Sequence, residues 1–598
     1  MKFKKYGKYQ PDAIDFPGEE VQPLEFIQLS HYPRLNYLIG FILERKPEKA
    51  AEYIEALEKG YSDLTKKNFT EGHLSQLKEI LAKYEHLKDN RKLALSVLNY
   101  YLQLLDFPEE TDWLNEKVKP TDRNYLQSFL RARYYNVSFL AEVLGKEEAV
   151  KLYKIYRTLY AIEANPEYKD KMKDVDHFSE ENFKGVREEK YPGAVVVLGT
   201  PKNGKMYYRK DTCFWARAIE DLPDSDFRYL AACYSDFEGA KIHWNQNFIL
   251  TMDHTIAKGD PYCSCIIHDT RVDWNLKHPP KEFWDSIWPL HDWQKKHEKK
   301  TEKKFQKEFQ QLGFYAPEVL DKLDEVQPLD VVDKSSFNRL NFLLGFIKKH
   351  KPEKYNDFIK NLEKNYTQMS KIDYYGTKKE VYNITEKLAN FENLKKHKLL
   401  AISSLNYFLG LLDIQSNIDW INEKILVPKG NFFRSFLIPR YQNVRILADT
   451  IGREEAVRLY KIYRTEHAKI FTAANRRTRF ESLEDLRQDD FDDYENDSNP
   501  GWVRIEGIVE NGKFIYRKDS CLYAEAMKDY PDTEFKFLAA CYYDFEGTKL
   551  QWNKHFILTM GHTIAEGDPY CSCVVHDTRV DWDLTHPPKE YWDSIKPQ

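Results

Sequence analysis

The chain lacks the features that mark several common classes of protein. No unbroken apolar run approaches the roughly 20 residues that a membrane-spanning helix needs, and the mean hydropathy is −0.68. Positive charge is not in excess, since 90 Lys and Arg residues stand against 95 Asp and Glu residues. Proteins that bind a phosphate backbone usually carry a concentrated positive surface. We therefore expect neither a membrane protein nor a nucleic-acid-binding protein.

Short nucleotide-binding and hydrolase signatures are missing as well. The sequence contains no G-x-G-x-x-G, P-loop, H-E-x-x-H or G-x-S-x-G pattern, so the sites that those patterns build gain no support. The first ten residues are basic but lead into Pro11 and Asp12 rather than into the apolar region of a secretory signal. We expect a cytoplasmic protein that acts on a small molecule.

A long internal repeat is the main feature that is present. Residues 259–274 read GDPYCSCIIHDTRVDW and residues 567–582 read GDPYCSCVVHDTRVDW, which are identical at 14 of 16 positions. The match extends upstream, where EEAVKLYKIYRT (147–158) corresponds to EEAVRLYKIYRT (454–465). This period is far too long for a solenoid. We predict a tandem duplication whose two modules pack as an intramolecular pseudo-twofold dimer, with further self-association left open.

Hydrophobic periodicity divides each repeat into two parts. In the first part apolar residues such as Leu93 and Val97 recur at helical spacing, which predicts an all-α region. The second part reads as hairpin, helix, helix, hairpin, with the helices starting near Cys213 and Asp226. This order predicts an α+β fold with an antiparallel sheet and helices on one face. The predicted domains are 1–160 (helical), 161–288 (α+β), 289–325 (linker), 326–467 (helical) and 468–598 (α+β).

Two charged segments separate these parts. The linker contains QKKHEKKTEKKFQKEFQQ, which has no Gly or Pro and predicts a solvated helix. Residues 161–190 are highly charged and match poorly between the repeats, and the second repeat carries ENDSNPG at 495–501. We predict a surface loop in that place.

Eight cysteines occupy corresponding positions in the two repeats. The large size of the chain and the lack of a secretory signal argue against disulfides, so each repeat carries four thiols. The alternatives for each thiol are a role in a site and simple burial as a small apolar side chain. The pairs are Cys213 and Cys521, Cys233 and Cys541, Cys263 and Cys571, and Cys265 and Cys573.

Local sequence suggests how some of these thiols lie. Cys213 follows Asp211 and Thr212, which predicts a thiol in the first turn of a capped helix. The helix dipole there favours the thiolate and a lowered pKa. Cys263 and Cys265 are two residues apart on a predicted strand, so both side chains should point to the same face.

Three histidine positions are also repeated. Of these, His254 precedes Cys263 in the second hairpin, and we predict that it orients or deprotonates a thiol. For His268 and His278 we favour structural hydrogen bonds. Thiols and a histidine also suit zinc, but Cys-Ser-Cys lacks the usual spacing of a zinc knuckle; we predict no metal or cofactor and keep zinc as the alternative. The pairs are His254 and His562, His268 and His576, and His278 and His586.

The second part of each repeat resembles the L-2-amino-thiazoline-4-carboxylic acid hydrolase family. The resemblance lies in a Cys that opens a helix, then C-x-x-D-F, then a strand that runs into a Gly-Asp turn and a Cys, over about 60 residues. The same pattern also resembles ligand-binding domains of the four-vinyl-reductase type. In the first repeat the pattern is Cys213, Cys233 to Phe237, and His254 to Cys263; in the second it is Cys521, Cys541 to Phe545, and His562 to Cys571.

The resemblance implies a hydrolase of carbon–nitrogen bonds other than peptide bonds, which opens a thiazoline ring to an N-carbamoyl cysteine in a biosynthetic pathway. Our hypothesis for the mechanism is thiolate attack on the amidine-like ring carbon. The candidate catalytic residues are Cys263, Cys571, Cys213, Cys521, His254, His562, Asp236 and Asp544. The candidate substrate-binding residues are Cys233, Cys541, Asp260, Asp568, Cys265 and Cys573.

The chain departs from the family pattern in two places. Family members carry an Arg eleven residues before the turn cysteine, where this chain has Met252 and Met560. They also carry an aromatic residue two positions after it, where this chain has a further cysteine. We therefore expect a different substrate. Arg133 with Asn136 either lines the cleft or forms a surface salt bridge, as do their counterparts Arg440 and Asn443. The alternative to an enzyme is a non-catalytic module that binds a small ligand or a metal.

Overall fold

The computed structural model describes the chain outside residues 70–73, 109–111, 292–293, 295–310, 379–381, 473–479, 496–500, 506 and 596–598. The chain forms two compact units. Unit 1 comprises Met1–Thr270, Leu276–Lys303 and Arg579–Trp582, and unit 2 comprises Arg271–Asn275, Lys304–Thr578 and Asp583–Gln598. Among the described residues, no helix is both long and apolar enough to cross a membrane.

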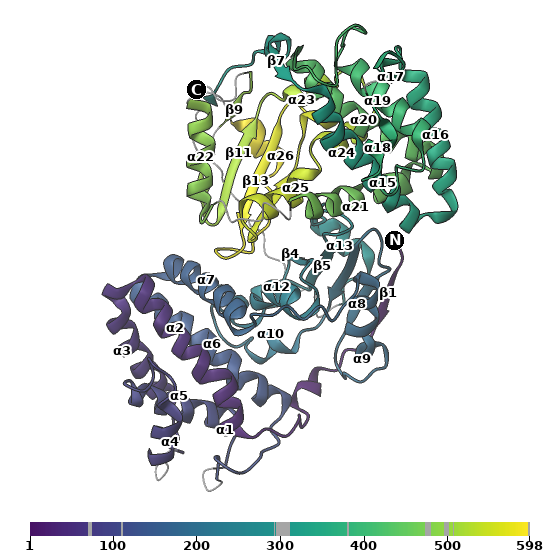
Figure 1. Ribbon diagram of the computed structural model, residues 1–598. Coiled ribbons are helices and arrows are strands. Elements are labelled where there is room, and N and C mark those ends of the chain that lie inside the picture. The colour runs from purple at the N-terminus through teal and green to yellow at the C-terminus, as the bar shows by residue number, and fades with distance from the viewer. Residues whose placement is uncertain are drawn as a thin grey trace. The chain divides into compact units, whose positions relative to one another are not determined.

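The first part of unit 1 is helical, as its apolar spacing predicts. The 23-residue helix α6 is capped by Thr121, whose hydroxyl accepts a hydrogen bond from the backbone N–H of Asn124, and it ends at Gly145 with a φ of 82°. Helix α6 packs against α3, α5 and α7, and also against the two short helices α10 and α11 of the second part (Figure 1). It therefore joins the two parts of the unit. The helices of this part are α1 (Pro23–Phe26), α2 (Tyr32–Arg45), α3 (Pro47–Leu64), α4 (Leu74–Leu81), α5 (Arg91–Leu104), α6 (Asp122–Leu144) and α7 (Lys146–Ala164).

The second part of unit 1 is built on an antiparallel sheet of five strands in the order β1-β2-β3-β5-β4. Both predicted hairpins are present, and β3 pairs with β5 between them. Asn203 and Gly204 form the first hairpin turn with positive φ angles, as tight hairpins favour. The edge strand β1 lies in the predicted helical domain 1–160; four residues containing two lysines gave too short a signal to predict. The strands are β1 (Phe3–Tyr6), β2 (Val196–Gly199), β3 (Lys205–Lys210), β4 (Phe248–Met252) and β5 (Cys263–Asp269).

Helices cover both faces of this sheet, so the prediction of helices on one face is wrong. One face carries the cysteines of β5, and helices α10 (Phe214–Ala218), α11 (Ser225–Ala232) and α12 (Ser235–Gly239) belong to that side. On the other face, Trp284 of α13 (Lys281–Ile287) packs against Tyr262 and Ile266, and all three are fully buried. The reason is that apolar residues alternate with the cysteines along the β5 region, which gives the sheet two faces to cover.

Residues 161–190 are a loop only in part, mainly over 165–174, which corrects a second prediction. They contain α8 (Val175–Asn182) and α9 (Lys184–Arg187). Asp174 caps α8 by accepting a hydrogen bond from the backbone N–H of His177 at 2.8 Å. Phe178 is fully buried with its ring centre 4.7 Å from that of Trp244. A single apolar face in a charged segment is thus enough to dock a helix on the domain.

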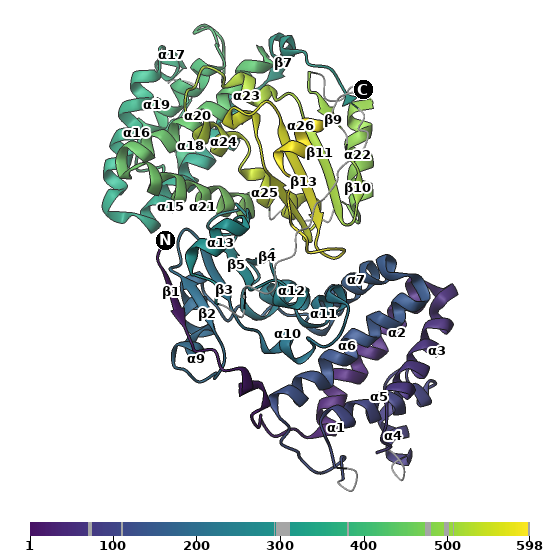
Figure 2. The same ribbon diagram turned by 180° about the vertical axis from the view of Figure 1, so that it is seen from behind.

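Unit 2 repeats this plan. Its sheet has the order β12-β13-β11-β9-β6, with β10 paired to β11, and it lies between α22 and helices α23 to α25 in both views (Figure 2). The twofold packing of the two modules stays a prediction. The strands are β6 (Gln311–Leu312), β7 (Leu323–Val326), β8 (Ile425–Pro428), β9 (Arg504–Ile505), β10 (Val509–Glu510), β11 (Lys513–Lys518), β12 (Phe556–Met560) and β13 (Cys571–Asp577). The helices are α14 (Pro328–Val331), α15 (Asn338–His350), α16 (Tyr355–Met369), α17 (Tyr374–Lys378), α18 (Ile384–Leu388), α19 (Lys398–Leu411), α20 (Lys429–Ile451), α21 (Arg453–Thr472), α22 (Leu483–Glu495), α23 (Leu522–Ala526), α24 (Thr533–Ala540), α25 (Tyr543–Gly547) and α26 (Lys589–Ser594).

Two predictions fall largely on residues outside the described part of the chain. The charged helix predicted within 289–325 covers residues 295–310, and ENDSNPG covers residues 496–500. The end of the predicted linker is described, and it is not a continuous helix. It contains strand β6, a short 3-10 helix over Pro317–Asp321 and strand β7.

Candidate functional site

The four cysteines of unit 1 gather on one side of the sheet. In the β3–β5 ladder Lys210 lies opposite Cys263 and Tyr208 opposite Cys265, so both thiols share a face, as their spacing predicts. Burial raises the pKa of Cys263 well above its usual value, and the neighbouring Cys213 and Cys265 raise it further. Cys263 and Cys213 in turn raise the pKa of the buried Cys233. All four thiols are free, and we call them the thiol cluster of unit 1.

Cys213 lies at the start of α10, but it is the cap rather than a residue of the first turn. Its Sγ accepts a hydrogen bond from the backbone N–H of Ala216 at 3.5 Å. The two residues predicted as its cap have other partners. Asp211 forms a buried ion pair with Arg209 at 2.7 Å, and the hydroxyl of Thr212 donates to the carbonyl of Gly193.

The predicted lowering of the Cys213 pKa is wrong. Burial raises the pKa of this thiol, and the charge of Lys210 and the N–H of Ala216 offset only part of the increase. A helix of five residues offers a weak dipole, whereas desolvation penalises the thiolate directly. Cys265 follows the same rule, since burial raises its pKa to about 12 against the opposing effect of Lys210.

Two charged residues accompany the thiols. Burial acts to lower the pKa of Lys210, but Cys265 and Asp236 act in the opposite direction and leave it raised. Burial raises the pKa of Asp236, which lies in the first turn of α12, while Lys210 and Arg157 act to lower it. A lysine, a carboxyl group and four thiols therefore influence one another in one small region.

Solvent reaches this region from one side. Cys263, Cys265 and Cys233 are buried, with exposed fractions of 5%, 1% and 7%. Cys213, Lys210 and Asp236 are only partly buried. The open side of the cluster is thus the side with the helix-capping thiol and the two charged groups.

Unit 2 builds the same cluster. Lys518 lies opposite Cys571 and Tyr516 opposite Cys573 in the β11–β13 ladder. The Sγ of Cys521 accepts a hydrogen bond from the backbone N–H of Ala524 at 3.4 Å. The cluster is more open here, because Cys541 is partly exposed and Asp544 is exposed. Desolvation by the surrounding protein nevertheless raises the pKa of Asp544.

The structure does not bring His254 to the thiols. Its Nδ1 lies 3.1 Å from the Oγ of Ser264, and Ser264 lies between the two strand cysteines and therefore points to the opposite face. The Nε2 of His278 also lies 3.1 Å from that Oγ. In unit 2 Ser572 bonds His562 and His586 in the same way.

The other repeated histidines complete this network. Thr251 Oγ1 lies 3.0 Å from Nδ1 of His278 and 3.0 Å from Nε2 of His268. Burial lowers the pKa of His278 to about 3, so the ring is neutral at pH 7. The predicted structural hydrogen bonds of His268 and His278 are confirmed.

Asp260 holds the turn before β5. Its Oδ2 accepts a hydrogen bond from the backbone N–H of Thr255 at 2.8 Å, and Gly259 has a φ of 95°. Asp568 accepts from Thr563 in unit 2 at 2.9 Å. These carboxylates shape the loop beside the cluster.

Lys210 and Arg157 were not among the site residues predicted from the sequence. The signal for Lys210 was present, because the strand pairing of YRKD with YCSC sets this lysine opposite Cys263. Among the described residues, no group of three or more His, Cys, Asp and Glu side chains is arranged to hold a metal ion.

The α+β part of unit 1 thus gathers Lys210, Asp236 and the thiol cluster on one side of its sheet. The chain can be compared with known families. Residues 127–267 match the family model named L-2-amino-thiazoline-4-carboxylic acid hydrolase, which confirms the predicted resemblance. The matched region runs from α6 to β5 and so contains the whole thiol cluster of unit 1 with Lys210 and Asp236. No curated protein and no solved structure matches the chain.

Proposed function

We propose that the protein is a small-molecule hydrolase that acts on the C–N/C–S centre of a cyclic amidine, with Cys213 and Cys521 as nucleophiles. One observation carries this proposal. Cys213 is the partly exposed thiol of its cluster, it accepts a backbone hydrogen bond at a helix start, and it lies near both Lys210 and Asp236. The family match over the same residues supports the hydrolase class.

In this proposal the Cys213 thiolate adds to the amidine carbon of the ring. The ring C–S bond breaks, and the departing sulfur takes a proton, which leaves an isothiourea on the enzyme. Water then adds to the same carbon, and the enzyme thiol leaves as the N-carbamoyl product forms. Each step uses only the substrate, water and protons.

The neighbouring groups suit these steps. The positive charge of Lys210 lowers the pKa of Cys213, so it favours the thiolate. Burial raises the pKa of Asp236, which suits this carboxyl group to exchange a proton with the sulfur or with water. His254 has no part, since it bonds Ser264 on the other face.

A second candidate is a non-catalytic module that binds a small ligand on the thiols. The raised pKa values of Cys233, Cys263 and Cys265 favour it, because a protonated thiol is a poor nucleophile. In that case the thiols would only shape the wall of the binding site.

Turnover of 2-amino-thiazoline-4-carboxylate and related cyclic amidines separates the two candidates. We expect Cys213→Ser with Cys521→Ser to lower turnover about 100-fold or more, while the protein stays folded. The matched control is Cys233→Ser with Cys541→Ser, which changes thiols of the same clusters that are not proposed to react. Binding without turnover in the unchanged protein would support the second candidate instead.

A further inference from the structure

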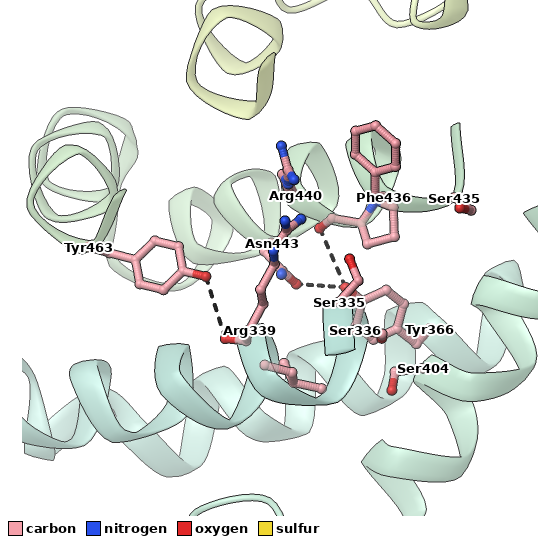
Figure 3. A pocket seen from close by; sticks show the side chains of 12 residues that line it. Ser335, Ser336, Arg339, Tyr366, Ser404, Ser435, Phe436, Arg440, Asn443 and Tyr463 are labelled. Atoms are coloured by element: carbon pink, nitrogen blue, oxygen red, sulfur yellow. Dashed lines mark hydrogen bonds between the residues drawn. The ribbon is translucent and has the colours of Figure 1, made fainter. Parts of the chain in front are cut away.

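A second site lies in the helical part of unit 2, away from the sheet. Figure 3 shows a small pocket among helices α15, α16, α19, α20 and α21 that is partly open to solvent. Its lining is mostly polar and contains two arginines and four serines. The lining residues include Ser336, Arg339, Ser404, Pro439 and Arg440.

The lining of this pocket carries positive charge and contains no carboxylate. Burial lowers the pKa of Arg339 to about 10, and Arg464 lowers it further. Burial and the charges of Arg339 and Arg464 lower the pKa of Arg440. The three guanidinium groups thus repel one another, and the carboxyl group of Asp544 offsets part of the charge of Arg440 and Arg464.

Several of their donors also lack partners. Nη1 of Arg339 and Nε of Arg440, the two arginines that line the pocket, are buried without a hydrogen bond. Another nitrogen of Arg440 donates to the carbonyl of Ala539 at 3.0 Å, which fixes the side chain in place. Buried donors without a hydrogen bond are costly, and a bound anion would accept those hydrogen bonds and add negative charge beside the arginines.

We propose that this pocket binds the carboxylate or phosphate group of a small anion. Guanidinium groups donate two hydrogen bonds in the plane of such a group, and serine hydroxyls can add further ones. No cysteine lines this pocket, and the proposal does not depend on the hydrolase activity.

Unit 1 offers a natural comparison. It keeps the arginines as Arg34, Arg133 and Arg157, but the positions of Ser336, Ser404 and Pro439 hold His31, Val97 and Ala132. His31 is buried, and its ring centre lies 4.6 Å from that of Tyr101. A neutral imidazole therefore stands where unit 2 has a small hydroxyl, and we assign the anion site to unit 2.

Titration calorimetry of the full chain with inorganic phosphate and with acetate tests the proposal. We expect one saturable site per chain, an affinity at least tenfold lower in Arg339→Gln, and loss of the site in Ser336→His. The matched control Arg34→Gln in unit 1 should leave the affinity unchanged. Saturation by phosphate alone would assign a phosphate ligand, and saturation by acetate alone a carboxylate.

Thermal unfolding without added anion shows whether each variant is folded. A folded Arg339→Gln protein with unchanged affinity would overturn the proposal, as would equal losses in Arg339→Gln and Arg34→Gln. Absence of saturable binding of either anion to the unchanged protein would also overturn it. If Ser336→His does not fold, Arg339→Gln alone decides.

Discussion

The two units share three strands of their sheets almost residue for residue, but they differ in their helical layers. The β3–β5 and β11–β13 ladders have the same register, and the same serine, threonine and histidines bond on the far face. In the helical layer, by contrast, a buried imidazole at position 31 corresponds to a serine at position 336. Side chains of the sheet contact other residues on both faces, so substitutions there are constrained. Residues that line the pocket lie on helices and can be substituted without disturbing a strand. We infer that the units share their chemistry and differ in what their helices bind.

The largest expected effect concerns the tryptophan behind each thiol cluster. Trp284 and Trp592 are fully buried, and their Nε1–H groups donate to the carbonyls of Pro279 and Pro587. Replacing either by Ala should cost about 3–5 kcal/mol of unfolding free energy in its own unit. Denaturant unfolding of Trp284→Ala and Trp592→Ala measures this. A cost in one unit only would show that the two sheets are not equivalent.

Single-copy cysteine variants separate the two sites. If both units turn over substrate, Cys213→Ser and Cys521→Ser should each leave the activity of the other unit. We expect Cys521→Ser to remove the larger share, because Asp544 beside it is exposed whereas Asp236 is partly buried. Initial rates of the two variants measure this. Equal losses would mean that the difference in openness has no effect on access.

Two buried histidines of the helical layers should lower the free energy of unfolding in acid. Burial lowers the pKa of His31 to about 3 and that of His467 to about 2. Below pH 6.5 the unfolded chain binds protons that these rings cannot accept in the folded state, so stability falls as the pH drops toward 3. The slope is at most about 1.4 kcal/mol per pH unit for each ring.

Exchanging residues between the units sharpens this prediction. Unit 1 has Tyr160 at the position of His467, so His31→Ser and His467→Tyr each import the residue of the other unit. Unfolding between pH 4 and pH 8 should show a shallower pH dependence in each variant. An unchanged dependence would mean that other groups cause the acid sensitivity.

The smallest effect is a difference in thiol reactivity within one cluster. The raised pKa values leave little thiolate at pH 7, so alkylation by iodoacetamide should be slow and should speed up with pH. Cys213 should react before Cys263, since it is partly exposed and its pKa is raised less. Peptide mass spectrometry over time measures the order. Faster labelling of Cys263 than of Cys213 would indicate that Cys263, on strand β5, is the nucleophile.

Much of the sheet could be predicted, because hairpins and strand parity are local properties. The spacing of Cys263 and Cys265 was enough to set both thiols on one face. The role of His254 could not be predicted, because strand parity ends at Met252 and the following loop turns the ring toward Ser264. The anion pocket could not be predicted from the sequence for another reason. Its arginines at 339 and 440 come from two helices, α15 and α20, and only their packing brings them together.

Trapping the reaction intermediate tests the central claim most directly. A turnover reaction is stopped with acid, and the peptides that contain each cysteine are weighed by mass spectrometry. The account predicts a substrate-derived adduct on Cys213 and Cys521 and none on the other six thiols. Turnover with the adduct on Cys263 and Cys571, or with no adduct on any cysteine, would contradict it.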